Sequence, residues 1–214
     1  MKISRRGLGQ GMAAAAGGLA LSGIGAGPVY AQRSANTLRV AFRDAVPNVD
    51  PYFNSQRTGL IVAHQVMDGL VHRDPDTFRN VPALATEWAW QGNTAIDFKI
   101  RPGVKFHDGS PLNADAVVWN VRKVLDKSAP HFDASQVGVT TSRMPTLREA
   151  RKIDDLTVEL TTSEPDSFLP LNLTNLFMAS PTHWEAKLKA VPAGVTDAAE
   201  RAKQAWGAFA ADAS

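Results

Sequence analysis

An alternating pattern of apolar and polar residues around a polar turn constrains the fold of this chain most strongly. Residues 86–91 and 95–101 alternate in this way on either side of Gly92-Asn93. A period of two is typical of half-buried strands, and Gly and Asn favour the tight turn that joins antiparallel partners. The sequence therefore predicts a β-hairpin. Its inward-facing residues are expected to be Trp88, Trp90, Ile96, Phe98 and Ile100.

Further elements follow from the same kind of reading. Residues 147–153 and 156–162 flank Asp154-Asp155 and predict a second hairpin. Asn113 is expected to cap a helix from residue 114 to about residue 127, and Gly69 to end an earlier helix in a left-handed conformation. Residues 81–85 are interpreted as a connector. Other helices are expected at 58–67, 181–188 and 197–211, and other strands at 38–42, 70–73 and 176–179.

The first 31 residues have the three parts of an export signal. A basic start, Met1 to Arg6, precedes a Gly- and Ala-rich apolar stretch, and Val29-Tyr30-Ala31 has the residue sizes that signal peptidase accepts. The run Ser4-Arg5-Arg6-Gly7-Leu8 resembles a twin-arginine signal. The alternative is a membrane anchor, but the many Gly residues weaken both helicity and hydrophobicity. We expect cleavage after Ala31 and a periplasmic location.

The leader also distorts the charge balance. It holds three of the 23 basic residues and none of the 21 acidic ones, so the rest of the chain carries 20 basic and 21 acidic residues. A nearly neutral chain lacks the basic footprint of a nucleic-acid-binding protein. Cysteine is absent from the sequence, which excludes a disulfide scaffold, thiolate ligation of a metal and a cysteine nucleophile.

Sequence motifs for catalysis are also missing. The five histidines lie more than four residues apart, so the helical two-histidine zinc pattern is absent. The sequence has no Gly-x-Ser-x-Gly motif and no phosphate-binding glycine loop. The acidic pairs Asp74/Asp76 and Asp154/Asp155 lie in predicted turns, where Asp commonly bonds to the backbone. We therefore predict a binding protein rather than an enzyme, with no cofactor.

The most specific block of the sequence is residues 98–112, FKIRPGVKFHDGSPL, which continues into 113–118. This block resembles family 5 of the extracellular solute-binding proteins, the periplasmic components of ABC importers for oligopeptides, dipeptides and nickel. Its Pro-Gly and Asp-Gly turns are interpreted as scaffold, because they shape the chain between short strands. Weaker blocks are 38–41, 49–51, 67–71 and 81–88.

The resemblance implies an α/β chain with the two-lobed fold of periplasmic binding proteins of type II, cluster C. Because members are much longer, we expect this sequence to hold only part of the first lobe and not to bind solute alone. The expected segments are a signal peptide at 1–31, the first segment of lobe I at 32–75, an inserted α/β subdomain at 76–162 and a return segment to lobe I at 163–214.

The resemblance also implies a monomer that captures a peptide or similar small solute and delivers it to an ABC permease with its ATPase subunits. Nothing in the sequence distinguishes a peptide from a nickel chelate or an opine. Residues inferred by position to face the ligand are Val46, Pro47 and Asn48, then His131 and Phe132, and finally Asn175, Leu176, Phe177 and Met178.

Two other readings stay open. A twin-arginine-exported enzyme with a cofactor is one, since that route often carries folded cofactor proteins, and an absorption spectrum would detect the cofactor. The other is a relic without binding activity, whose exposed lobe face would favour aggregation.

Overall fold

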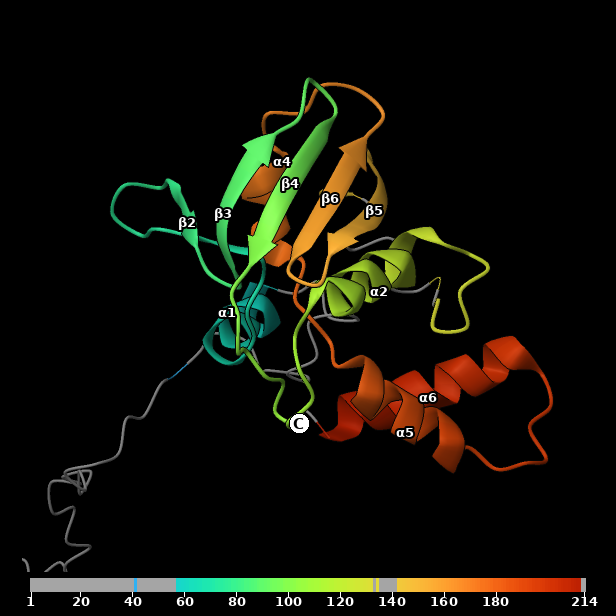
Figure 1. The fold of residues 1–214 in the computed structure, drawn as a ribbon. Coiled ribbons are helices and arrows are strands. Elements are labelled where there is room, and N and C mark those ends of the chain that lie inside the picture. Colours follow the sequence, from blue (N-terminus) through green and yellow to red (C-terminus); the bar gives the residue numbers. More distant parts are fainter. Residues whose placement is uncertain (1–40, 42–56, 133, 135–141, 213–214) are drawn as a thin grey trace, which may run out of the picture. The chain divides into compact units, whose positions relative to one another are not determined.

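The computed structural model describes residues 41, 57–132, 134 and 142–212. Their main feature is a four-stranded antiparallel sheet in the order β3-β4-β6-β5 (Figure 1). Strands β3 (Ala85–Trp90) and β4 (Ala95–Ile100) form one hairpin, and β5 (Leu147–Asp154) and β6 (Thr157–Thr162) form the other. Both predicted hairpins are confirmed.

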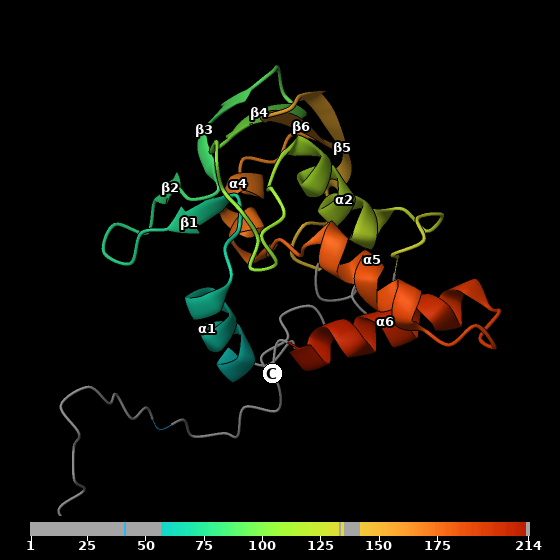
Figure 2. The ribbon, with the colours of Figure 1, turned by 60° about the horizontal axis from the view of Figure 1, so that its bottom comes forward.

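One face of this sheet is the main core. Ile96, Phe98 and Ile100 on β4 are at most 2% exposed, and Trp88 on β3 stacks on Phe98 with ring centroids 6.2 Å apart. Helices α2 (Ala114–Leu125) and α4 (Leu169–Asn172) lie against this face (Figure 2). A 3₁₀ helix at Leu173–Asn175 follows α4. The alternation in the sequence therefore predicted the buried face correctly.

Helix α2 begins where the sequence predicts. The Asn113 side chain accepts a hydrogen bond from the Ala116 backbone N–H at 3.0 Å, which satisfies one of the free donors of the first turn. The helix ends at Leu125, two residues earlier than expected, because Asp126 has extended backbone angles.

A second core lies between three other helices. Helices α5 (Pro181–Ala190) and α6 (Ala198–Asp212) pack side by side (Figures 1 and 2), and α1 (Arg57–Val66) contributes Ala63. Trp184 and Trp206 are at most 2% exposed in this core. All three helices were predicted: α1 from apolar residues at helical spacing, α5 from the proline at its start and α6 from its Ala-rich composition.

An aromatic stack joins α2 to this second core. The His131 ring lies 4.1 Å from the Trp119 ring at an angle of 11°, and its Nε2 is 3.0 Å from the Trp119 carbonyl oxygen. Trp206 donates its indole N–H to the His131 carbonyl at 3.0 Å. Burial lowers the pKa of His131 to about 4, although the hydrogen bond to Trp119 favours the protonated ring.

Three local expectations are wrong. Residues 176–179 form no strand but a buried irregular segment. Residues 81 and 82 of the expected connector belong to strand β2 (Asn80–Pro82), which pairs with β1 (Val71–Arg73). Gly69 does not adopt a positive φ. The position requires glycine for a different reason: a Cβ there would lie 3.0 Å from the Leu173 carbonyl oxygen. The missing side chain lets two backbone segments approach closely.

The outer strands of the sheet are irregular. Edge strand β3 has a register shift between Ala85 and Glu87, and edge strand β5 has shifts between Leu147 and Glu149 and between Lys152 and Asp154. The inner pairing of β4 with β6 runs without a shift.

The main core draws residues from all three of the predicted lobe segments that follow the leader. Leu70, Phe98 and Leu173, one from each segment, belong to one buried cluster. Because the core is shared, it does not separate the segments, and the boundaries at 75 and 162 stay a prediction. Within the described ranges, no helix is long and apolar enough to cross a membrane.

Gly69→Ala is expected to lower the free energy of unfolding by about 1–3 kcal/mol, because the new Cβ would press on backbone oxygens. Gly207→Ala is the matched control. Gly207 lies inside α6 with nothing within 4 Å of an added Cβ, so alanine should raise the free energy of unfolding by about 0.5–1 kcal/mol. Urea unfolding followed by circular dichroism measures both, and a loss of the same size in both variants would contradict the close approach at Gly69.

His131 should make the fold acid-sensitive. Its pKa of about 4 in the folded chain lies below the ordinary value of 6.5, so the unfolded chain binds a proton first as the pH falls. Stability is therefore fully present above about pH 6.5 and is lost toward pH 4, by about 2 kcal/mol between pH 7 and pH 5. His131→Phe keeps a ring in the stack and removes this titration. Unfolding curves of the two proteins from pH 7 to 4.5 should therefore differ in slope, and parallel curves would refute the assignment.

Candidate functional site

The loop that follows β4 forms one wall of the candidate site. Gly103 and Gly109 adopt positive φ values of 77° and 83°, which few other residues tolerate. The loop closes on itself, because Phe106 donates its backbone N–H to the Ser110 carbonyl at 2.8 Å. Asp108 reinforces this turn by accepting hydrogen bonds from the backbone N–H and the hydroxyl of Ser110, at 2.9 and 2.6 Å.

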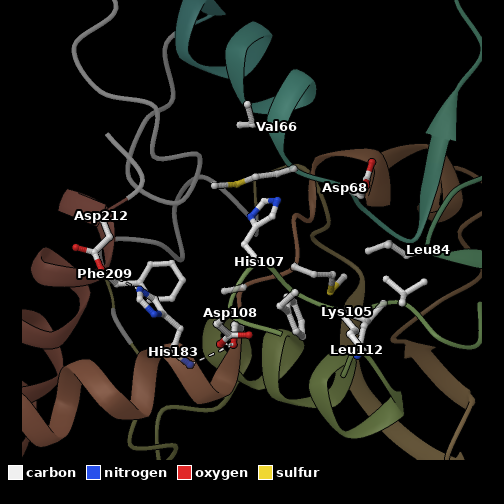
Figure 3. Close-up of a pocket in the computed structure, with 16 residues that line it drawn as sticks. Val66, Asp68, Leu84, Lys105, His107, Asp108, Leu112, His183, Phe209 and Asp212 are labelled. Atoms are coloured by element: carbon white, nitrogen blue, oxygen red, sulfur yellow. Dashed lines mark hydrogen bonds and ion pairs between the residues drawn. The ribbon is translucent and has the colours of Figure 1, made fainter. Parts of the chain in front are cut away.

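A cavity of about 400 Å³ opens beside this loop (Figure 3). Its other walls come from the end of α1, from residues 178–183 and from the last turn of α6. Its apolar lining is Val66, Met67, Leu84, Val104, Phe106, Leu112, Met178, Ala179 and Phe209. Its polar lining is Asp68, Lys105, His107, Asp108, Ser180, His183 and Asp212. Pockets with an apolar lining and a few polar groups are typical of sites for small molecules.

Asp108 links the loop to the start of α5. The Ser180 hydroxyl donates a hydrogen bond to its Oδ2 at 2.5 Å and also accepts one from the His183 backbone N–H at 3.1 Å, which caps α5. Partial burial acts to raise the pKa of Asp108, but the hydrogen bonds from Ser110 and Ser180 outweigh it and hold the pKa below its usual range. The Asp108 carboxylate therefore already accepts hydrogen bonds from within the protein and serves to hold this wall together.

Asp212 links the last turn of α6 to α5. It forms an ion pair with Lys187. Its Oδ2 also lies 3.2 Å from His183 Nε2 (Figure 3). The hydrogen bond from Lys187 holds the pKa of Asp212 below its usual range. The His183 ring also meets Phe209 edge to face, with centroids 5.0 Å apart.

Three charged or ionisable groups at the cavity remain available to a ligand. Asp68, Lys105 and His107 are exposed, and none has a side-chain hydrogen bond or ion pair within the part of the chain that the structure describes. Figure 3 shows the His107 side chain projecting from the loop toward the end of α1. The cavity thus combines an apolar lining with both signs of charge at its rim.

The residues predicted from sequence are distributed over several places. Met178 lines the cavity, whereas the neighbouring Leu176 is buried and does not line it. Phe177 meets the His64 ring edge to face at 4.9 Å, and the Asn175 side chain donates hydrogen bonds to the Asn172 carbonyl and the Thr174 hydroxyl, at 3.5 and 3.2 Å. Burial, together with the nearby His72, lowers the pKa of His64.

Of the other predicted residues, His131 and Phe132 lie away from the cavity. His131 is 3% exposed in the aromatic stack, and neither it nor the half-buried Phe132 lines the cavity. Val46, Pro47 and Asn48 lie outside the described residues. Sequence reasoning missed Lys105, His107 and Asp108, because the turns around them were interpreted as scaffold. Among the described residues, no cluster of His, Asp and Glu could hold a metal ion.

Known proteins resemble this chain over the same region. The family model described as bacterial extracellular solute-binding proteins, family 5 Middle, matches residues 79–210. The peptide transport periplasmic protein SapA of Salmonella typhimurium is 35% identical over 140 residues, covering 55% of this chain and 24% of SapA. The glutathione-binding protein GsiB of Pectobacterium atrosepticum is 35% identical over 151 residues, covering 70% of this chain and 27% of GsiB.

The fold has solved counterparts. A dipeptide-binding protein of Pseudoalteromonas, in complex with Met-Leu, superposes with a TM-score of 0.60 at 23% identity, covering 67% of this chain and 31% of that protein. These solved counterparts confirm the expected α/β architecture of two-lobed periplasmic binding proteins. The chain spans about a quarter of the length of the two curated relatives. Since the family model covers well over half of the sequence, the chain belongs to the bacterial extracellular solute-binding proteins of family 5.

Proposed function

We propose that this chain acts in the solute-binding component of an ABC importer, which captures a peptide or similar small solute and delivers it to a membrane permease with its ATPase subunits. The observation that carries the proposal is the family match over residues 79–210, which span the four-stranded sheet, α2, α5 and most of α6. The mechanism is capture without chemical conversion: a solute that contacts two lobes only when they close shifts the equilibrium toward the closed state.

The cavity is the surface through which this chain would contact the solute. A peptide offers both apolar side chains and charged ends, and the cavity offers an apolar lining beside Asp68, Lys105 and His107. The names of SapA and of the dipeptide-binding protein support a peptide as the solute. We further propose that Met178 contacts the solute directly, and that Asn175, Leu176 and Phe177 support the same wall.

The location and assembly state are part of the same proposal. The leader at 1–31 would direct export by the twin-arginine route, and cleavage after Ala31 would release a monomer into the periplasm. The name of SapA, a periplasmic protein, supports this location. The predicted contacts of Val46–Asn48, His131 and Phe132 with the solute stay predictions. The family match gives no support to the alternative of an exported cofactor enzyme.

Calorimetric titration of the purified product of the complete gene tests the proposal. The panel contains Met-Leu, a tripeptide, glutathione, a nickel–histidine chelate and an opine. Saturable binding of one class, with a matching rise in the thermal unfolding midpoint, is expected because ligand binding stabilises the folded state. A protein that is folded by circular dichroism yet binds no member of the panel would count against the function.

His107→Ala tests whether the cavity takes part. The side chain is exposed and bonds to nothing in the described part of the chain, so the unfolding midpoint should stay within about 1 °C. Solute affinity should fall about fivefold or more, as expected for the loss of one contact worth about 1 kcal/mol. Lys203→Ala, on the exposed side of α6, is the control and should bind as the unaltered protein does. Equal affinities in all three proteins would place the solute elsewhere.

A further inference from the structure

The cavity wall at residues 178–180 is not held by a β-ladder. Met178, Ala179 and Ser180 all line the cavity, but the segment belongs to no strand of the described structure. Its backbone is nevertheless buried, so its N–H and C=O groups need partners. Each of the three residues is held by a different part of the fold.

Ala179, the middle residue, is held by one side chain of α2. Asn120 accepts a hydrogen bond from the Ala179 N–H at 2.8 Å through Oδ1, and its Nδ2 donates to the Ala179 carbonyl at 2.9 Å. The same Nδ2 donates to the carbonyl of Ala116 at 2.9 Å. Asn120 is fully buried and does not line the cavity. One amide thus replaces the two hydrogen bonds that a neighbouring strand would supply.

The flanking residues are held by other parts of the cavity wall. The Met178 N–H donates to the Asp68 carbonyl at 3.2 Å, and the Ser180 hydroxyl donates to Asp108. Asp68 and Asp108 line the cavity themselves, so these bonds join parts of the same wall. The bonds from Asn120 are the ones that fix this wall to the core of the sheet, because α2 packs on β5 and β6.

The orientation of the Asn120 amide is also set. The Ala179 backbone N–H can only donate, and Lys123 Nζ donates a second hydrogen bond to Oδ1 at 3.4 Å. The oxygen therefore faces Lys123 and the Ala179 N–H, while the nitrogen faces the two carbonyls. Lys123 itself is 1% exposed and lies over the Trp206 ring, 5.4 Å from its centroid. Only one orientation of the Asn120 amide therefore gives each of these donors and acceptors a hydrogen-bond partner.

We propose that Asn120 is a positioning residue for solute binding: it does not touch the solute but fixes the backbone of Met178–Ser180 and so the shape of the cavity. The inference rests on the proposed function. Without the amide, the Ala179 N–H and carbonyl would be buried without partners, which is costly. The segment would shift to find others, and Met178 would shift with it.

Asn120→Leu is the main test variant, because leucine keeps the branched shape and the number of side-chain heavy atoms and removes both hydrogen bonds to Ala179. Asn120→Ser is the second variant. The smaller serine leaves room for a water molecule, which together with the hydroxyl can hydrogen-bond to the Ala179 N–H and carbonyl in part. This variant can therefore be tested if Asn120→Leu does not fold. Val121→Ala is the matched control. Val121 is the next residue on α2, is 1% exposed and makes no hydrogen bond to Ala179. Its replacement by alanine should therefore lower stability and leave the hydrogen bonds that hold Met178–Ser180 in place.

Affinity is measured by calorimetry on the complete gene product, with whichever solute of the panel binds, at a temperature where each protein is folded. Asn120→Leu should weaken binding about tenfold or more and Asn120→Ser less, whereas Val121→Ala should bind within about twofold of the unaltered protein. The Met178 methyl resonance in the solute-free protein should move in both Asn120 variants and stay in place in the control. Hydrogen exchange at the Ala179 amide should accelerate in the same two variants.

The outcomes separate the two proposals. Unchanged affinity in a folded Asn120→Leu protein overturns the positioning role and leaves the function intact. An equal loss of affinity in Val121→Ala also overturns it, because general destabilisation would then explain the effect. If the unaltered protein binds no solute, the function fails, and unchanged Ala179 exchange in the Asn120 variants would refute the structural part of the inference as well.

Discussion

The apolar inner face of the four-stranded sheet is the constraint on which the rest of the described structure depends. A sheet cannot bury its own face, so other elements must cover it. The cover comes from α2, between the two hairpins in sequence, and from residues 169–178, which follow the second hairpin. Leu70 and Leu173 meet beneath it, both fully buried. The cavity opens beside this junction, so the position of the site is a consequence of how the sheet is covered.

Local signals predicted most of the elements. Both hairpins are joined by turns whose residues are typical of turns, and Asn113 caps α2 through a bond to a residue three positions away. The errors occurred where the partner is distant in sequence. Residues 176–179 have the composition of a strand, yet the partner of Ala179 is the side chain of Asn120, 59 residues earlier. Gly69 is a second case: glycine is required there by the Leu173 backbone, which is far away in the sequence but in close contact in the fold.

The candidate site was predictable only in part for a related reason. Met178 was inferred from the resemblance to a family and does line the cavity. The loop around Asp108 was interpreted as scaffold, and the structure shows that Asp108 makes the turn through Ser110 and also binds Ser180 across the cavity wall. Because the turn alone explains an aspartate at this position, the sequence gives no sign that Asp108 also bonds to a residue far along the chain. His131, also inferred as a solute contact, stacks on Trp119 within the aromatic core, and its contact with the solute stays a prediction.

The irregular outer strands have a consequence for how the chain behaves among its own copies. A regular edge presents a row of unpaired backbone groups that another sheet can extend. Here β3 is interrupted near Glu87, and β5 is interrupted twice and carries Arg148, Arg151 and Lys152. Neither edge of the described sheet therefore offers an even template for strand addition. Copies of the chain therefore meet no regular strand edge in the described sheet through which they could pair.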